Sequence, residues 1–539
     1  MVIEQQQNNS DNNQTASDDN SLSDEGDRRI IELGYEPVFK REFGRLSSFS
    51  FAFSISGLYA TIATTFIYGL QAGGAPALVW CWLIAGSGCM CIALSVAELV
   101  SAYPTSGGLY FTLKYLVPTE HVPLTSWLCG WLNLLGQVAG VASTDYGCSQ
   151  LLLAAISMGT GFRYQPTAGH TVGVMAAIII LHGFINSLTT KWLDRVTRWY
   201  AIFHLAVLVS ASIVLLVFQK EKHSTKYVFI EVQPHSGWSP VGFSFLFGFL
   251  SVAWAMTDYD ATAHIAEEIQ NAAVRAPQAI ASALFLTYSL GFLFNIVLAF
   301  TMGDIRDLLS SPTAQPFAQI FYNVLGATGG ILFTLFAFII LNFCGIAALQ
   351  ANARTIFAFS RDELLPFSKV WIRMNSYTQT PLIAVWLNVF LAVGINLIGL
   401  GSYTAIAAIF NVCAIALDWS YCIPIICKLI YGAKTGGYIP GPWNLGKFSA
   451  PINSWSVIWT LFVSIIFLMP TNRPVTAENM NYAVVILVGI LTFAMIYWFV
   501  GGARKYYTGP RTKHQMQKEN DNIIEFVSSP YEKDQVIKF

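Results

Sequence analysis

The feature that most constrains this chain is a succession of long apolar segments, each long enough to cross a lipid bilayer. A membrane-spanning helix needs about 20 mainly apolar residues, and the 539-residue chain contains about twelve such segments. We place these spans at residues 47–70, 76–103, 125–158, 170–188, 196–218, 241–265, 278–302, 328–352, 381–400, 403–430, 455–470 and 480–501. The sequence therefore predicts an all-α polytopic membrane protein.

Composition supports the same class. Hydrophobic residues make up 54% of the chain and charged residues 11%, whereas about 25% of the residues of a soluble domain are charged. Mean hydropathy is +0.51. A net charge of -1 gives no reason to expect nucleic acid as a partner, so the expected surroundings are the lipid bilayer.

The ends of the chain are polar. Residues 1–46, which begin with a run rich in Asn, Gln, Ser and Asp, are predicted to form a disordered tail. No basic segment followed by a short apolar one opens the chain, so we expect no cleaved signal peptide. Most Lys and Arg residues of the short loops fall on one side of the predicted stack. By the positive-inside rule that side is cytosolic, which puts the first tail and a second one, 503–539, in the cytosol.

Two of the spans look interrupted. Residues 54–59 place small residues and a glycine inside the first span, and residues 254–260 place two carboxylates inside the sixth. Transporter sites often lie where discontinuous helices expose their backbone to a cavity, and ionisable residues within spans are functional by default. We therefore predict a transport core at 47–430, made of the first ten spans, followed by two further spans within 431–502.

The interruptions suit a small zwitterionic or cationic substrate. Freed N–H groups at the start of a half-helix attract a carboxylate, and freed carbonyl groups attract an ammonium group. The predicted substrate-binding residues flank the two breaks: Ser54, Ser56, Gly57, Leu58, Tyr59, Trp254, Thr257, Asp258 and Tyr259.

Four residues are candidates for ion coupling, namely His204, Asp258, Asp260 and His264. Each also has a structural interpretation. Asp258 fits as a cap of the second half-helix, His264 as a packed side chain four residues after Asp260, and His204 as a partner in an interhelical hydrogen bond.

The second span ends in a charged residue and a turn. Glu98 is followed by Pro104-Thr105-Ser106-Gly107-Gly108. A carboxylate at the end of an apolar span is costly in lipid unless it faces protein or water. We expect Glu98 to form an ion pair or hydrogen bond that fixes this turn, with Pro104, Gly107 and Gly108 in structural or gating roles.

The run from 98 to 110 resembles a signature of the amino-acid/polyamine/organocation permeases. Residues 57–82, 257–268 and 354–366 resemble the fungal amino-acid/choline branch of that superfamily, and together the matches cover most of 40–430. The closest likeness is to 4-aminobutyrate permeases. Choline, polyamine and thiamine carriers belong to the same branch and remain alternatives, as does a nutrient-sensing transceptor.

The resemblance implies a LeuT-like fold of two inverted five-helix repeats plus two helices. It also implies secondary active import, coupled to protons or to sodium. Some prokaryotic relatives carry a lysine near the place of His204, where its charge substitutes for a sodium ion. The expected location is the plasma membrane, with the vacuolar membrane as the alternative.

Other classes find little support in the sequence. Motifs of the forms His-Glu-x-x-His, Gly-x-x-x-x-Gly-Lys-Ser/Thr and Gly-x-Ser-x-Gly are absent, so we expect neither an enzyme nor a cofactor. The nine cysteines lie mostly in apolar segments without a Cys-x-x-Cys pair, which argues against a metal site. Two interrupted helices in one chain favour a carrier over a channel. The sequence leaves the oligomeric state open.

Overall fold

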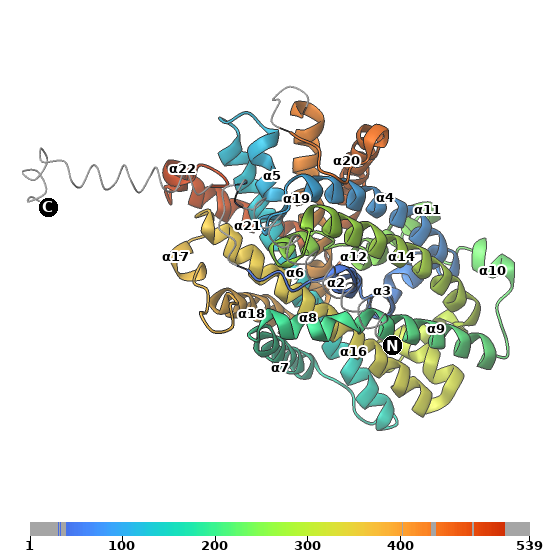
Figure 1. Cartoon of the computed structure of the whole chain (residues 1–539). Helices are drawn as coiled ribbons and strands as arrows, with labels where there is room; N and C mark the ends of the chain where they lie inside the picture. The colour runs from blue at the N-terminus through green and yellow to red at the C-terminus, as the bar shows by residue number, and fades with distance from the viewer. Residues whose placement is uncertain are drawn as a thin grey trace, which may run out of the picture.

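The structure is a bundle of helices that surrounds the helical segment Arg45–Gly73 (Figure 1). This computed structural model describes residues 31, 33, 39–401, 403–432, 438–476 and 479–511. Within those residues the regular structure is helical, with one isolated bridge between Phe43 and Ile269.

Among the described residues, the first half of the bundle contains nine helices. They are α2 (Arg45–Ser56), α3 (Leu58–Gly73), α4 (Ala75–Ala102), α5 (Gly108–Leu116), α6 (Val122–Gly159), α7 (Ala168–Asn186), α8 (Thr190–Arg198), α9 (Tyr200–Phe218) and α10 (Thr225–Phe229). Of these, α2 and α3 form the predicted first span, and α5 is a short helix that follows the turn at 104–108.

The second half begins with the interrupted sixth span. Its helices are α11 (Val241–Leu246), α12 (Phe249–Ala255), α13 (Ala261–His264), η1 (Ala266–Glu268), α14 (Ala272–Thr301), α15 (Ile305–Leu309), α16 (Pro316–Arg361), α17 (Ser368–Trp371), α18 (Leu382–Asn396), η2 (Leu397–Leu400), α19 (Tyr403–Tyr431), η3 (Gly446–Phe448), α20 (Ser449–Phe467), α21 (Ala483–Phe499) and α22 (Ala503–Tyr506).

The helices confirm the predicted polytopic membrane class. Among the described residues, nine helical segments are long and apolar enough to span a bilayer, and Val241–Ala255 and Ala483–Phe499 are shorter apolar helices. The 38-residue α6 completes the predicted set, although it is less apolar than the others. Its polar residues, including Asn133 and Asp145, are buried against protein, so the helix does not need a purely apolar surface.

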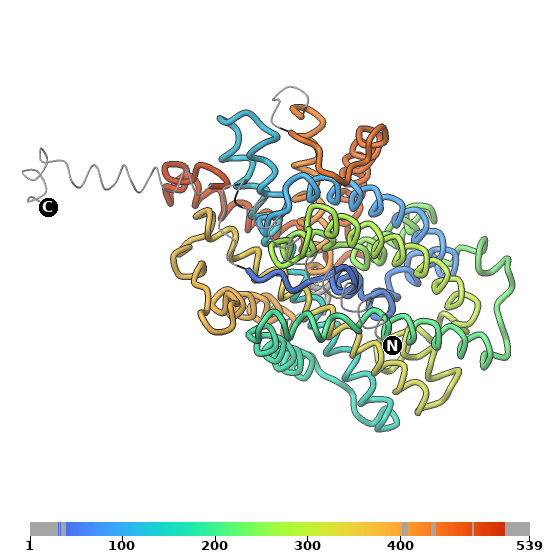
Figure 2. Tube along the Cα trace, in the orientation of Figure 1, coloured from blue at the N-terminus to red at the C-terminus, as the bar shows by residue number. Residues whose placement is uncertain are grey.

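The interrupted first span lies at the centre of the bundle. Of its most apolar stretch, 89% is buried, against 33% for the segment Thr190–Phe218. Around it, α16 and α19 pack against α6, and α14 packs against α4. Figure 2 shows α2 and α3, in dark blue, enclosed by chain from both halves of the sequence. A span shielded from lipid in this way can carry an irregular backbone.

Some boundaries differ from the predictions. The eighth span was placed at 328–352, but α16 runs from Pro316 to Arg361 with a kink at Gly326 (φ 72°). The eleventh was placed at 455–470, but α20 starts at Ser449.

The described parts of both predicted tails contact the bundle. Before α2 starts at Arg45, the Phe43 N–H already donates to Glu268 O at 3.0 Å. Beyond α21, Pro510 O accepts a hydrogen bond from Lys114 at 3.0 Å, and Arg511 lies 3.0 Å from Glu363. The chain is therefore packed against the bundle as far as residue 511. Residues 1–30 and 512–539 of the predicted tails lie outside the described residues.

Candidate functional site

The first predicted interruption is a single residue, Gly57, between α2 and α3. Its backbone is left-handed (φ 48°, ψ 31°), and its N–H donates to Phe53 O where α2 ends. A Cβ here would lie 3.4 Å from both Cys344 Cβ and Thr61 Cγ2. Glycine adopts this conformation without the steric cost that other residues carry, so this residue makes the break possible.

The second interruption, residues 256–260, separates α12 from α13. Asp258 has φ 58°, a left-handed conformation that is uncommon outside glycine and that clusters at functional sites. Its carbonyl, rather than its side chain, accepts the N–H of Ala261 at 3.1 Å, so no capping bond explains the carboxylate.

Two polar side-chain atoms at this second break have no hydrogen-bond partner among the described residues. Asp258 Oδ1 and Thr257 Oγ1 are buried and accept or donate no hydrogen bond among the described residues, and each residue is 8% exposed. Buried polar groups in folded proteins are nearly always hydrogen-bonded. The break therefore presents an unsatisfied acceptor and an unsatisfied hydroxyl that are both shielded from solvent, and such atoms suit a bound polar ligand.

The two breaks lie side by side. In the centre of Figure 1, α12 packs against α3, and α13 packs against α2. Cys344 of α16 joins them, because its thiol donates to Ile55 O at 3.0 Å while Asp258 is among its charged neighbours. Residues that are some 200 positions apart in sequence thus form one site.

Side chains at the first break point in several directions. Ser54 and Leu58 are buried, and the Ser56 hydroxyl lies 2.8 Å from that of Thr287 on α14. The Tyr59 hydroxyl donates to a backbone carbonyl at 3.3 Å. Its ring packs in an aromatic cluster with Phe294, Phe317 and Phe321. Of these side chains, Ser56 and Tyr59 are therefore engaged with neighbouring helices.

Aromatic residues flank the second break. The Trp254 indole N–H donates to Ser143 Oγ at 3.1 Å. The Tyr259 hydroxyl donates to Asp418 Oδ1 at 3.5 Å, and its ring lies 5.1 Å from that of Tyr421. These contacts anchor the unwound segment to α6 and α19.

Asp260 is the centre of a buried hydrogen-bond network. Its Oδ1 accepts from the Tyr421 hydroxyl on α19, and its Oδ2 accepts from the Asn133 side chain on α6 at 2.7 Å. His264 Nε2 lies 3.0 Å from the same Oδ2. A single carboxylate thus holds three helices together.

The protonation of His264 follows from its partners. Its Nδ1 lies 2.9 Å from Ser106 O, and because a carbonyl oxygen only accepts, Nδ1 must carry hydrogen. If Asp260 is ionised, Nε2 must also donate, and His264 is a cation. If Nε2 accepts, Asp260 must supply the proton. In both cases the pair holds one more proton than an ionised aspartate beside a neutral histidine would hold.

The turn at 104–108 is built against this histidine. Gly108 has φ 58°, and a Cβ there would lie 2.7 Å from His264 Cε1. The Ser106 N–H donates to Glu267 Oε1 at 2.9 Å. Pro104 is buried, and Gly107 has an ordinary φ of -67°. The backbone N–H and the backbone carbonyl of Ser106 therefore both contact the segment that follows the second break.

Glu98 makes the expected ion pair, but its partner does not belong to the turn. It pairs with Lys428 of α19 and accepts from Ser449 Oγ at 2.8 Å. We predicted that it fixes the turn, whereas the turn is held by His264 and Glu267. Lys428 is 330 positions away in sequence, so its proximity could not be inferred from the motif.

His204 of α9 touches the first break directly. Its Nε2 accepts the backbone N–H of Tyr59 at 3.0 Å, so in this structure Nε2 is unprotonated and the ring caps the start of α3. The Nδ1 atom is buried and has no partner among the described residues. The structure thus brings this predicted residue to the site, although it occupies one of the N–H groups that we expected to bind the substrate.

Several network residues were missed by the sequence analysis. Asn133 and Tyr421 were not singled out, although a polar Asn inside an apolar span was a usable signal. Asp145 of α6 lies 2.8 Å from His182 Nδ1.

Two further buried ion pairs lie on the side of the turn at 104–108, and the sequence analysis did not identify their arginine partners. They are Glu268 with Arg354 at 2.6 Å and Glu267 with Arg361 at 3.2 Å.

Comparison with known proteins agrees with this architecture. The family model described as amino acid permease matches residues 43–491. An uncharacterized amino-acid permease of Schizosaccharomyces pombe is 65% identical over 503 residues, covering 93% of this chain and 92% of that protein. Amino-acid permease 2 of Neurospora crassa is 53% identical over 493 residues (91% and 90%), and amino-acid permease BAT1 of Arabidopsis thaliana 34% over 503 (91% and 97%).

The fold and the two interrupted helices define a multi-pass membrane carrier. The chain belongs to the amino acid permease family, and is thus an amino acid transporter. Since this is a family of transporters, the prediction that the chain is not an enzyme is confirmed.

Proposed function

We propose that this protein is a proton-coupled importer of a small amino acid, bound between the two helix breaks, with 4-aminobutyrate as the preferred candidate. The observation that carries the proposal is the unpaired, buried Asp258 carboxylate oxygen beside Thr257. An ammonium group would satisfy this acceptor, and the partial positive charge at the N-terminal end of α3 would attract a carboxylate. The breaks in the first and sixth spans also support a LeuT-like arrangement of two inverted repeats.

The proton is assigned to the Asp260–His264 pair. The contact of His264 Nε2 with Asp260 Oδ2 needs one proton between the two atoms. When the shared proton is lost, neither His264 Nε2 nor the Asp260 carboxylate carries a hydrogen. Two acceptor atoms then lie 3.0 Å apart. Their repulsion would loosen the contact of His264 with Ser106. Proton binding and release would thereby open or close the link between the second break and the turn at 104–108.

His204 is the alternative coupling residue. If its Nε2 gained a proton, it could no longer accept from the Tyr59 N–H, and that donor would be released for a substrate carboxylate. The two assignments differ in the helix that responds, because His204 acts on α3 and His264 on α13. Sodium remains the alternative coupling ion.

Choline, polyamines and thiamine are alternative substrates of the same site. Tyr259 and Tyr421, with ring centroids 5.1 Å apart, supply aromatic faces of the kind that bind quaternary ammonium. The relatives reported above are all named amino-acid permeases, which favours an amino acid. A transceptor would bind substrate at this site with little flux.

The orientation is part of the proposal. We place both tails, 1–46 and 503–539, in the cytosol, with 47–430 as the transport core and 431–502 contributing the last two spans. Plasma membrane is the preferred location and the vacuolar membrane the alternative.

Transport by the purified protein in liposomes tests the proposal. Uptake of labelled 4-aminobutyrate is measured with and without an inward proton gradient, against competing amino acids, choline, polyamines and thiamine. We expect saturable uptake that the gradient drives and that amino acids inhibit. Inhibition by choline or thiamine alone would change the substrate, whereas saturable binding with no uptake would indicate a transceptor.

A further inference from the structure

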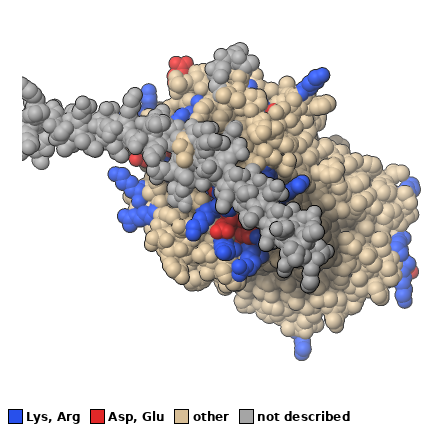
Figure 3. Space-filling model, viewed as in Figure 1, with Lys and Arg blue, Asp and Glu red and all other residues tan. Residues whose placement is uncertain are grey.

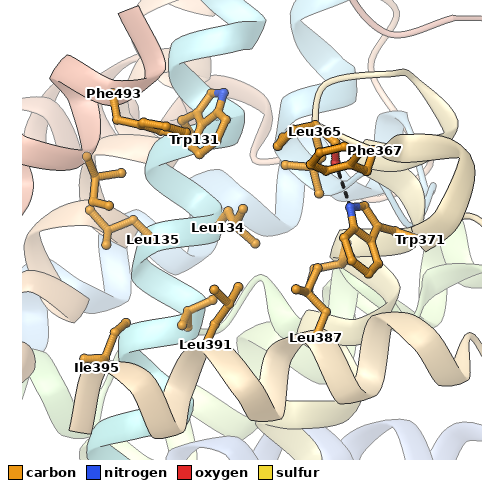
Figure 4. A pocket seen from close by; sticks show the side chains of 14 residues that line it. Trp131, Leu134, Leu135, Leu365, Phe367, Trp371, Leu387, Leu391, Ile395 and Phe493 are labelled. Atoms are coloured by element: carbon orange, nitrogen blue, oxygen red, sulfur yellow. Dashed lines mark hydrogen bonds between the residues drawn. The ribbon is translucent and has the colours of Figure 1, made fainter. Parts of the chain in front are cut away.

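A cavity lies away from the helix breaks, on the side of the bundle. It has a volume of about 350 Å³, within the ~300–1,000 Å³ range of ligand pockets. Figure 4 shows that Leu134 and Leu135 of α6, Leu391 of α18 and Phe493 of α21 point into it. The lining side chains are apolar or aromatic, so the groove suits a hydrocarbon ligand.

The groove opens on a surface that faces lipid. The helices α18 and α21 both pack against α6, and they carry outward apolar side chains beside the groove. Phe390 of α18 is 73% exposed and Phe493 of α21 is 50% exposed. In a bilayer the molecules next to such side chains are acyl chains, so the occupant is a membrane lipid rather than a soluble metabolite.

One rim of the groove is basic. Phe367, which precedes α17, and Trp371, its last residue, line the groove. The Trp371 indole N–H donates to Pro366 O at 2.7 Å. Lys369 and Arg373 are exposed on the same short segment and form no ion pair among the described residues. Figure 3 shows blue side chains gathered over α17. Anionic lipids of the cytosolic leaflet attract such residues.

A polar atom at the groove also lacks a partner. Trp131 lines it and is 7% exposed, and its indole N–H has no acceptor among the described residues. Buried tryptophan N–H groups usually find an acceptor. The 38-residue α6 is roughly 57 Å long against about 30 Å of hydrocarbon, so its early turns, including Trp131, approach the depth of lipid ester carbonyls.

We propose that this groove binds one anionic phospholipid, with an acyl chain among α6, α18 and α21. The phosphate lies near Lys369 and Arg373, and an ester carbonyl accepts from Trp131. The choice of leaflet rests on the orientation proposed above, but the lipid site does not depend on the substrate or the coupling ion.

Photo-crosslinking in vesicles tests this proposal. The protein is placed in phosphatidylcholine vesicles with phosphatidylserine in both leaflets, so its orientation does not matter. A phosphatidylserine, phosphatidylcholine or sterol probe with a photoreactive apolar end is added, and labelled peptides are identified. We expect the phosphatidylserine probe to label residues 131–138 and 387–395 preferentially. Lys369→Glu combined with Arg373→Glu should lower this labelling by roughly tenfold.

Two further variants make the result decisive. Leu391→Trp should fill the groove and abolish labelling, while Lys220→Glu with Lys222→Glu, exposed on another loop, should leave it unchanged. Equal labelling by the three probes, preferential labelling by the sterol, or labelling unaffected by the change at Lys369 and Arg373 would overturn the proposal. Uptake is not measured, so failure of the transport proposal would not affect this result.

Discussion

At the scale of single residues, the protonation of the two histidines at the site follows from whether their partners can donate or only accept a hydrogen bond. Ser106 O can only accept, which fixes hydrogen on His264 Nδ1 and makes the Asp260–His264 pair hold one shared proton. Tyr59 N–H can only donate, which makes His204 Nε2 an acceptor. These assignments identify the two places where gain or loss of a proton would change a contact with an interrupted helix.

His264→Gln separates proton coupling from folding. Glutamine can donate to and accept from the same neighbours, but it does not titrate. We expect proton-driven accumulation of substrate to be lost while exchange of labelled for unlabelled substrate, without a gradient, is retained. Accumulation that still follows the proton gradient would show that the pair is not the coupling site, and the matching His204→Gln protein would then be the next to measure.

Gly108→Ala tests how closely the turn is fitted to the histidine. The left-handed backbone at this position costs other residues ~1–2 kcal/mol, and the added Cβ would lie 2.7 Å from His264 Cε1. We expect a lower midpoint of thermal unfolding in detergent. Gly173→Ala is the control, since a Cβ there meets nothing within 4 Å and alanine favours a helix. An equal midpoint for both variants would contradict the fit.

At the scale of elements, the site consists of two helices that stop and restart. The pattern of residues 54–59 and 254–260 predicted both breaks, because small residues and carboxylates are unfavourable within an apolar helix. The pattern could not predict that the Tyr59 ring turns into an aromatic cluster. Side-chain directions depend on which helices pack nearby, and this packing is set by contacts remote in sequence.

Gly57→Val tests the first break as an element. A β-branched residue at φ 48° is strongly disfavoured, so we expect α2 and α3 to rearrange and the affinity for substrate to fall. Gly57→Asn is the matched variant, because asparagine tolerates the left-handed region better. Substrate affinity measured on purified protein should fall more for valine than for asparagine. Unchanged affinity in the valine variant would refute a role for this break in binding.

The Glu98–Lys428 pair tests how α4 is tied to α19. Their side chains are 4% and 9% exposed, and removing one partner of a buried ion pair costs roughly 3–5 kcal/mol. We expect Glu98→Gln and Lys428→Met each to lower the thermal midpoint, and the double variant to lose less than the sum of the two. Strictly additive losses would show that the pair has no energetic coupling.

At the scale of the whole molecule, the length of the apolar segments was enough to predict the number and class of the spans. Their mutual contacts were not predictable, because Asp260 meets Asn133 and Tyr421 from spans far away in the chain. The same holds for Glu98, whose partner Lys428 is 330 residues away. The predicted candidates nevertheless converge, since His204, Asp258, Asp260 and His264 all lie at or beside the two breaks.

Equilibrium binding of labelled 4-aminobutyrate and of other small amino acids to the purified protein tests the central claim most directly. Asp258→Asn, which replaces the carboxyl group of Asp258 by an amide, is compared with Asp194→Asn. The Asp194 carboxylate lies away from the breaks and pairs with Arg198 at a distance of 2.6 Å. The account predicts that binding weakens by at least about tenfold, or ~1.4 kcal/mol, in the first variant and stays unchanged in the second. Equal binding by both variants and the unmodified protein would contradict it.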